Sequence, residues 1–314
     1  MKAKTIKQVL NRKVGAWLAT IDDPAVLKAL EGNIIVTGGC IASMLLGEDV
    51  NDYDVYFRTK AATLAAANYY VKKFEVKNRE GIPCAIYVDD SNDRVRIVIK
   101  SSGIASEDGA TKPYEYFEGN PDGTAGADYV GAVMQDTGEI EDVYQETEAK
   151  ALEAEDDGKP LYRPVFMSTN AITLSHRVQL ILRFFGEPDE IHKNYDFVHC
   201  TNYWDSRSKS LTLHQAAREA LLARELRYVG SKYPLCSIIR LRKFIKRGWA
   251  INAGQILKMA MQVSELDLKD LSVLEDQLTG VDVAYFIQVV SLLREKDPEK
   301  VNSAYLIEII DRLF

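Results

Sequence analysis

The chain has 314 residues, of which 46% are hydrophobic and 27% are charged. This length and composition predict a folded protein of about two domains and exclude a disordered polyelectrolyte. With 39 Lys and Arg against 46 Asp and Glu, the net charge of −7 excludes a uniformly basic nucleic-acid coat. Four widely spaced cysteines without a Cys-x-x-Cys pair indicate neither a zinc knuckle nor a disulfide framework, so we expect a cytoplasmic location. No signal peptide or membrane span is predicted.

Helices and strands alternate over the first hundred residues. Apolar positions at helical spacing predict two short helices within 5–31, the second capped by Asp23 with Pro24 as its first residue. A β-branched strand then ends in the turn Gly38-Gly39, and a helix follows until Gly47 stops it. The remaining predictions are a strand over 53–58, a helix over 61–73 and a hairpin over 84–88 and 95–99.

Charge is segregated along the chain. Residues 101–160 hold 16 Asp and Glu against 3 Lys, with frequent Gly and few large aliphatic residues. This composition predicts an insertion, a lid or a partly disordered loop. Residues 205–260 hold 12 Lys and Arg against 3 acids, which predicts the basic surface of the protein.

The second half of the chain begins with strands and ends with helices. We predict strands over 172–174, 178–184 and 196–203, with a helix opening at Pro188 between the last two. From residue 213 to the end, apolar residues recur at helical spacing, interrupted by Gly and Pro. The four histidines share no spacing that is typical of metal ligands, so no zinc site is predicted.

Two neighbouring motifs indicate nucleotide chemistry. Adjacent glycines at a helix N-terminus let backbone amides approach a phosphate, whose charge the helix dipole favours. Asp52 and Asp54 lie two positions apart on the next strand, so strand alternation directs both carboxylates to one face. Two hard oxygen ligands of this kind hold Mg²⁺ against a triphosphate. Either motif alone is more often a turn or a solvated strand end, but their coupling predicts a nucleotide and metal site.

The pattern Gly-Gly-x-Ile-x-x-x-Leu-Leu-Gly followed by Asp-Tyr-Asp-Val resembles the head of the DNA polymerase β nucleotidyltransferase superfamily. It is most similar to the branch of bacterial tRNA CCA-adding enzymes and poly(A) polymerases, which segments 189–203 and 227–244 also resemble. The resemblance implies an α+β fold. A mixed-sheet nucleotidyltransferase head domain would span 1–210, with the acidic insertion at about 101–160, and an all-helical domain would span 211–314.

The resemblance also implies roles for single residues. The triphosphate would be held by Gly38, Gly39 and Ser43, with Arg58 or Lys193 as further phosphate partners. Two Mg²⁺ ions would be held by Asp52 and Asp54 and by a third group, for which two positions are open. Gln179 stands where the branch tends to carry that group but offers only an amide. Asp196 is flanked by apolar residues, as a third ligand would be, and is the residue that we favour, either as the third ligand or as the base on the acceptor.

The implied reaction is Mg²⁺-dependent transfer of a nucleoside monophosphate from an NTP to an acceptor hydroxyl, and we expect an RNA 3′ end as acceptor. Arg240, Lys243 and Arg247 share one helix face and would contact the RNA backbone, although a solvated face is an equal alternative. This sequence departs from the branch at Ala42-Ser43 and Asn194-Tyr195, where the branch carries Arg-Asp and two arginines. The alternatives are transfer to a protein or small molecule, or a catalytically silent nucleotide- or RNA-binding protein.

Overall fold

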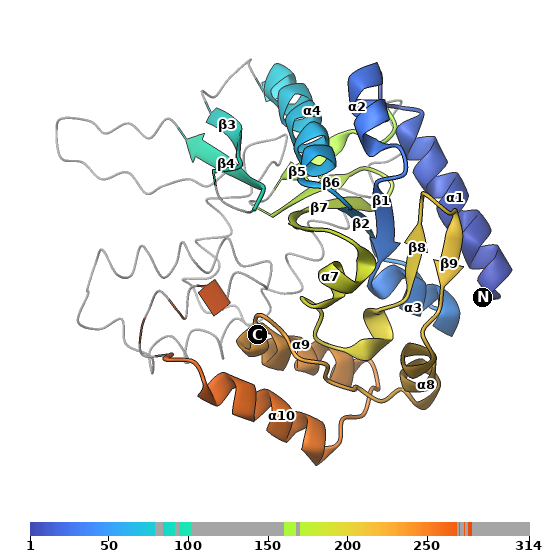
Figure 1. The fold of residues 1–314 in the computed structure, drawn as a ribbon, viewed down its shortest axis with the longest axis vertical. Coiled ribbons are helices and arrows are strands. Elements are labelled where there is room, and N and C mark those ends of the chain that lie inside the picture. The colour runs from blue at the N-terminus through green and yellow to red at the C-terminus, as the bar shows by residue number, and fades with distance from the viewer. Residues whose placement is uncertain are drawn as a thin grey trace. The chain divides into compact units, whose positions relative to one another are not determined.

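The fold, taken from a computed structural model, is a mixed sheet with helices (Figure 1). The structure describes residues 1–78, 84–91, 94–101, 160–167 and 170–268, together with 270, 273, 276 and 277. Within these residues the chain forms two compact units. Unit 1 contains 1–101, 160–188 and 203–211, and unit 2 contains 189–202 and the described residues from 212 onward. The predicted domain boundary near 210 stays a prediction.

A seven-stranded mixed sheet forms the centre of unit 1 (Figure 1). Its strand order is β5-β6-β7-β2-β1-β8-β9. The pairing of β2 with β7 is parallel, whereas β1–β2, β1–β8, β5–β6 and β6–β7 are antiparallel. A separate antiparallel hairpin joins β3 to β4. The strands are β1 (Ile34–Thr37), β2 (Tyr53–Phe57), β3 (Cys84–Asp89), β4 (Arg96–Ser101), β5 (Pro164–Met167), β6 (Ala171–Leu174), β7 (Val178–Phe185), β8 (Tyr203–Asp205) and β9 (Ser210–Thr212).

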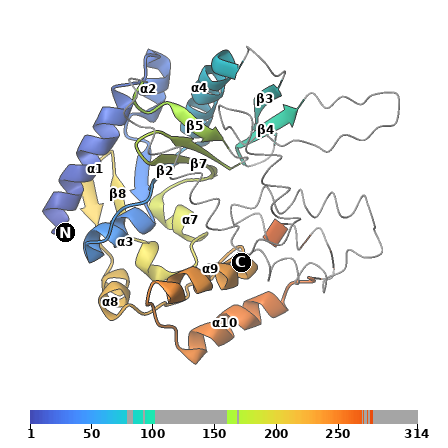
Figure 2. The same cartoon turned by 180° about the vertical axis from the view of Figure 1, so that it is seen from behind.

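Four helices belong to the first part of unit 1 (Figure 2). They are α1 (Ala3–Leu18), α2 (Pro24–Leu30), α3 (Gly39–Leu46) and α4 (Lys60–Asn78). As predicted, Pro24 opens α2 and the Asp23 carboxylate accepts the Ala25 amide at 2.8 Å, which satisfies a donor that the helix cannot pair internally. The predicted strand, glycine turn and helix are confirmed, and Gly47 ends α3 in the left-handed conformation.

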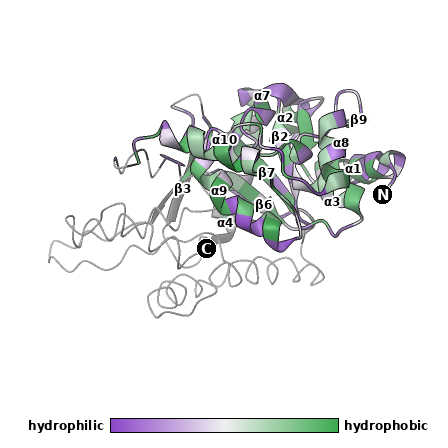
Figure 3. Cartoon of the chain, turned by 90° about the horizontal axis from the view of Figure 1, so that it is seen from below, coloured by the Kyte–Doolittle hydropathy of each residue, from purple (hydrophilic) through white to green (hydrophobic). Residues whose placement is uncertain are grey.

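The described part of unit 2 is helical (Figure 3). It contains α7 (Pro188–His192), whose first residue belongs to unit 1, the 3₁₀ helix η2 (Val198–Cys200), α8 (Gln215–Ala223), α9 (Pro234–Lys246) and α10 (Ala253–Ser264). The helical prediction after residue 213 is therefore confirmed as far as residue 264. The predicted strand over 196–203 is wrong, because η2 interrupts it and only β8 follows. Local β propensity was outweighed here by packing among the helices of unit 2.

Some predictions fall on residues outside those that the structure describes. These are most of the acidic insertion, from 102 to 159, and almost all of the chain beyond 277. Among the described residues, no helix combines the length and apolar composition that a bilayer crossing requires.

Candidate nucleotide and metal site

The turn between β1 and α3 allows a ligand to approach the backbone amides closely. Gly38 has a φ of 97°, a conformation that strongly favours glycine, and it is the N-cap of α3. Since glycine has no side chain, it supplies no capping oxygen to the first amides of the helix. A Cβ added at Gly39 would meet nothing within 4 Å, so packing does not require glycine there. This turn therefore leaves room for an anion at the positive end of the helix dipole.

The strand that carries Asp54 lies beside this turn. Asp54 is the second residue of β2, and Asp52 immediately precedes the strand. In the antiparallel register Val36 pairs with Val55, so the next step brings Thr37 opposite Asp54. Gly38 and Gly39 follow Thr37 directly in the chain. The sheet thus places the acidic strand next to the glycine turn, within a single compact unit.

Asp54 belongs to a row of polar residues that crosses the sheet. On one side, Gln179 of β7 is paired with Asp54 and Thr173 of β6 is paired with Gln179. On the other side, Thr37 pairs with Tyr203 of β8. Paired residues project from the same face, so the five side chains line one face of the sheet. Thr173 is 3% exposed and its hydroxyl has no hydrogen-bond partner, so this face contains an unsatisfied buried polar group.

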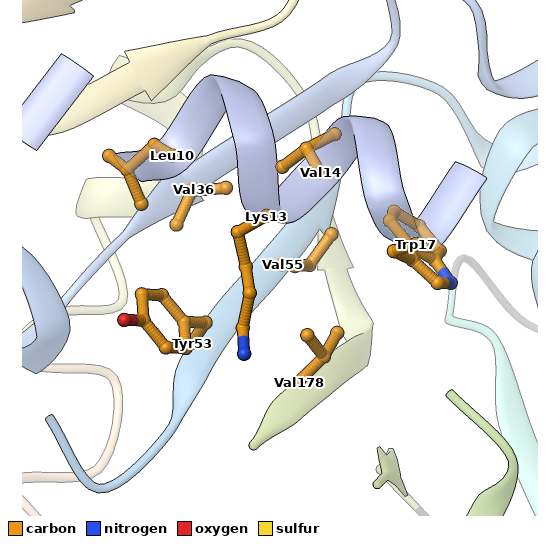
Figure 4. A pocket seen from close by; sticks show the side chains of 8 residues that line it. All are labelled: Leu10, Lys13, Val14, Trp17, Val36, Tyr53, Val55 and Val178. Atoms are coloured by element: carbon orange, nitrogen blue, oxygen red, sulfur yellow. The ribbon is translucent and has the colours of Figure 1, made fainter. Parts of the chain in front are cut away.

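On the opposite face of the sheet, mostly apolar side chains of α1 pack against the strands. Figure 4 shows Leu10, Val14 and Trp17 of α1 above side chains of β1, β2 and β7. Tyr53 and Val55, which alternate with the aspartates, point to this side, and the Lys13 ammonium lies 4.8 Å from the Tyr53 ring centre. The shallow depression there is a packing contact, because its lining is almost wholly aliphatic and aromatic.

The donor set fits a hard divalent cation held jointly with a substrate. Among the described residues no group of three or more His, Cys, Asp and Glu side chains is suited to hold a metal ion. Mg²⁺, however, is commonly bound by one or two carboxylates together with phosphate oxygens. Asp52 and Asp54 would supply the two carboxylates, and Gln179, which is paired with Asp54, would offer a neutral oxygen. When bound, the ion would neutralise phosphate charge during transfer.

Arg58, one of the predicted phosphate partners, is tied into an ion-pair cluster of unit 1. It is buried and pairs with Asp205 at 2.8 Å and with Glu187. Burial by itself would raise the pKa of Asp205, but the hydrogen bonds from Arg58, the Arg207 amide and Ser208, together with the positive charge of Arg58, lower that pKa. A phosphate contact by Arg58 would have to break these pairs.

Asp196, the favoured third ligand, lies in unit 2 and is 7% exposed. Its carboxylate accepts the Ser237 hydroxyl at 2.8 Å and forms an ion pair with Arg240, both on α9. Its backbone carbonyl accepts the Val229 amide. Binding of a metal by Asp196, or of RNA by Arg240, would have to compete with this pair. Both roles stay predictions.

The other predicted residues occupy varied settings. Ser43 is buried in the second turn of α3. Lys193 is exposed and pairs with Glu190 at 2.7 Å. Lys243 and Arg247 are exposed at the end of α9. Sequence reasoning missed Thr173, although Ile172-Thr173-Leu174 shows the same alternation of a polar residue between apolar ones that marks Asp54.

Two histidines of unit 2 are largely shielded from solvent: His199 is buried and His192 is half-buried. His199 packs among the rings of Phe197, Phe244 and Trp249, the last at 4.3 Å between ring centres. Burial first, and then the positive charge of Arg247, lowers the pKa of His199 to about 4. Burial, followed by the nearby His214, also lowers the pKa of His192 to about 4. Both therefore act as neutral packing residues near pH 7.

Comparison with known proteins assigns a family. A family model described as "Gad2: Gabija anti-defense 2 family protein" matches residues 8–224. The chain belongs to the Gabija anti-defense 2 family. A curated relative, "Gabija anti-defense 2" of Bacillus phage SPbetaL7, is 23% identical over 139 residues, which cover 44% of this chain and 33% of that protein. This member of the Gabija anti-defense 2 family therefore matches a third of its relative's length.

Two solved structures are similar to this Gabija anti-defense 2 family member at low TM-scores. The Thermotoga maritima CCA-adding enzyme complexed with tRNA-CCA has 14% identity and a TM-score of 0.37, covering 80% of this chain and 45% of that one. The Bacillus stearothermophilus CCA-adding enzyme in complex with CTP has 12% identity and a TM-score of 0.38, covering 88% and 51%. The family match itself includes the glycine turn, both aspartates and Gln179.

Proposed function

We propose that this chain is a Mg²⁺-dependent nucleotidyltransferase whose transfer reaction acts against the Gabija defence. The observation that carries the proposal is the adjacency of the Gly38-Gly39 turn and Asp54 on paired strands of one sheet. The turn offers backbone amides to a phosphate, and the strand offers carboxylates to a cation. This combination has no evident structural purpose, whereas a metal-bound triphosphate needs both parts.

The reaction is an in-line displacement at the α-phosphorus of an NTP. The acceptor oxygen forms a bond to this phosphorus while the bond to the β-phosphate oxygen breaks, so pyrophosphate leaves and the hydroxyl proton passes to solvent. Amides of the glycine turn would hold the phosphates. Asp52 and Asp54 would hold one or two Mg²⁺ ions. In this way they would orient the triphosphate toward the acceptor.

The acceptor that we favour is an RNA 3′ hydroxyl. Arg242, Lys243, Lys246 and Arg247 form an exposed basic surface at the end of α9, which suits a phosphate backbone. A protein acceptor is the second candidate. It is favoured by the ion pair between Arg240 and Asp196, which removes one of the three predicted RNA contacts, and by the family description, which names a defence system as the target.

The test is incubation of the purified chain with each α-³²P-labelled NTP, Mg²⁺, total RNA and protein from cells that carry the Gabija defence. Label in RNA supports the favoured acceptor, and label in a protein of the defence system supports the second. Chains carrying Asp54→Asn are the control and should transfer no label. Absence of metal-dependent nucleotide binding, together with absence of label in every fraction, would refute the proposal.

A further inference from the structure

The turn between β6 and β7 holds two consecutive residues in an unfavourable conformation. His176 has a φ of 63° and Arg177 has a φ of 60°. Histidine is among the non-glycine residues that enter this left-handed region more often, whereas arginine rarely does. The antiparallel β6–β7 pairing closes at Leu174 and Val178, and a tight hairpin of this kind requires positive φ at consecutive residues, so the conformation is set by the hairpin and its energetic cost falls on these two side chains.

Contacts on both sides fix this turn. The Ser175 amide donates to the Arg163 carbonyl at 2.9 Å, and the Ser175 hydroxyl accepts the Arg163 amide at 3.2 Å. Ser175 is fully buried, and the His176 ring lies 5.2 Å from the ring of Tyr162. The turn therefore has little freedom to relax, and Arg177 projects from a rigid base.

Arg177 holds the chain on both sides of Asp52. Its carbonyl accepts the Tyr53 amide at 2.7 Å, and its guanidinium donates to the Val50 carbonyl at 2.8 Å. Tyr53 follows Asp52 directly, and Val50 precedes it by two residues. Both contacts reach the backbone of residues 50–53, and both lie within unit 1.

The two aspartates need different kinds of support. Asp54 lies within β2 and is held by strand pairing with Gln179 of β7. Asp52 lies before β2, in a stretch from 48 to 52 that has no helix or strand. Because Asp52 lies outside the strand, its backbone must be positioned by other contacts, and two ligands to one cation must be fixed relative to each other.

We propose that Arg177 is a positioning residue for Asp52. This inference rests on the proposed function, because it assumes that Asp52 and Asp54 hold one cation between them. Arg177 acts through the backbone of Val50 and Tyr53. It fixes the direction of the Asp52 carboxylate without binding the cation itself.

Glycine substitutions at the two strained positions separate positioning from folding. Arg177→Gly relieves its φ strain and removes the guanidinium, so its melting temperature should equal or exceed that of the wild type. Its affinity for Mn²⁺ in the presence of α,β-methylene-ATP should nevertheless fall by about threefold to tenfold, as loss of one hydrogen bond predicts. His176→Gly is the matched control, since it relieves the neighbouring strain, keeps Arg177 and should leave the affinity unchanged.

Two further variants make the result decisive. Arg177→Lys keeps a donor that can reach the Val50 carbonyl and should restore Mn²⁺ affinity to within about twofold of the wild type. The inference is overturned if Arg177→Gly binds Mn²⁺ as the wild type does, or if His176→Gly loses affinity by the same factor. If Asp52→Asn and Asp54→Asn also leave Mn²⁺ affinity unchanged, both the positioning role of Arg177 and the proposed function are wrong. If only those two variants lose affinity, the positioning role alone is wrong.

Discussion

Asp54 on β2 and Gln179 on β7 occupy paired positions in the parallel pairing of these two strands. Neighbouring strands lie about 4.8 Å apart, so an amide stands beside the aspartate that we assign to the metal. The amide is neutral at every pH, which leaves two carboxylates, those of Asp52 and Asp54, as the charged groups that we assign to the cation.

Gln179→Glu should raise the affinity of the site for Mn²⁺ by about tenfold, because it adds a negative charge next to the cation. Isothermal titration with Mn²⁺ and α,β-methylene-ATP measures this change. Gln8→Glu is the matched control, as it adds the same charge on an exposed position of α1, on the other side of the sheet. Equal effects of the two substitutions would show that Gln179 does not lie beside the cation.

Replacing Asp52 or Asp54 by Asn should abolish nucleotidyl transfer while the melting temperature changes little. Each substitution keeps the shape of the side chain and removes the charge that holds the cation. Transfer of label from an NTP and thermal unfolding, measured on the same preparations, test the two parts. A variant that keeps a substantial fraction of wild-type transfer in Mg²⁺ contradicts the metal assignment.

Asp196→Asn should lower the free energy of unfolding by roughly 1–3 kcal/mol, because it breaks a buried ion pair with Arg240. Mn²⁺ affinity should stay within about twofold of the wild type if this pair is the main role of Asp196. The sequence-based prediction of a third ligand gives the opposite pattern, with metal affinity lost and stability kept. Chemical denaturation and Mn²⁺ titration together distinguish the two.

Stability should fall as the pH is lowered from about 6.5 toward 4. The pKa of His199 is lowered to about 4 in the folded chain, whereas an unfolded histidine titrates near 6.5. Between these two pH values His199 is protonated in the unfolded chain and neutral in the folded chain. Proton binding therefore favours the unfolded chain, and the free energy of unfolding falls as the pH is lowered. The stabilisation is therefore complete above about pH 6.5, and up to about 3 kcal/mol is lost below pH 4.

His199→Phe removes this titration and keeps an aromatic ring among Phe197, Phe244 and Trp249. Urea denaturation at a series of pH values should give a flatter stability curve for the variant than for the wild type. The remaining slope should come from His192, whose pKa is lowered to a similar value, and near pH 4 from carboxylates such as Asp205, whose pKa is also lowered in the folded chain. A variant curve that is parallel to the wild-type curve would rule out the buried neutral state of His199.

Substituting Lys243, Lys246 and Arg247 by Ala should weaken RNA binding and flatten its salt dependence. Each lost contact to a single-stranded backbone removes about 0.7 from the slope of log K against log salt. Arg240 is left intact because it is paired with Asp196. Substitution of Lys2, Lys4 and Lys7 removes the same charge from the N-terminal end of unit 1 and is the control. Equal salt slopes for the two variants would favour a protein acceptor.

The sequence by itself determined the local architecture of the candidate site. The β-branched run before Gly38, the glycine pair and the stop at Gly47 predicted β1, the turn and α3, because each depends on backbone conformations that few residues adopt. Alternation in the following segment likewise predicted β2, in which Asp54 lies, whereas Asp52 immediately precedes the strand and its predicted orientation stays a prediction. These features are local, so neighbouring residues along the chain are sufficient to specify them.

Only the tertiary structure decided which residues surround those aspartates. Gln179 and Thr173 lie more than a hundred residues further along the chain, and strand register alone brings them beside Asp54. The sequence favoured Asp196 because of its apolar neighbours, yet those neighbours pack in unit 2, where Arg240 and Ser237 bind the carboxylate. Hydrophobic patterning identifies which residues are buried, whereas pairing between distant segments determines what a buried polar group contacts.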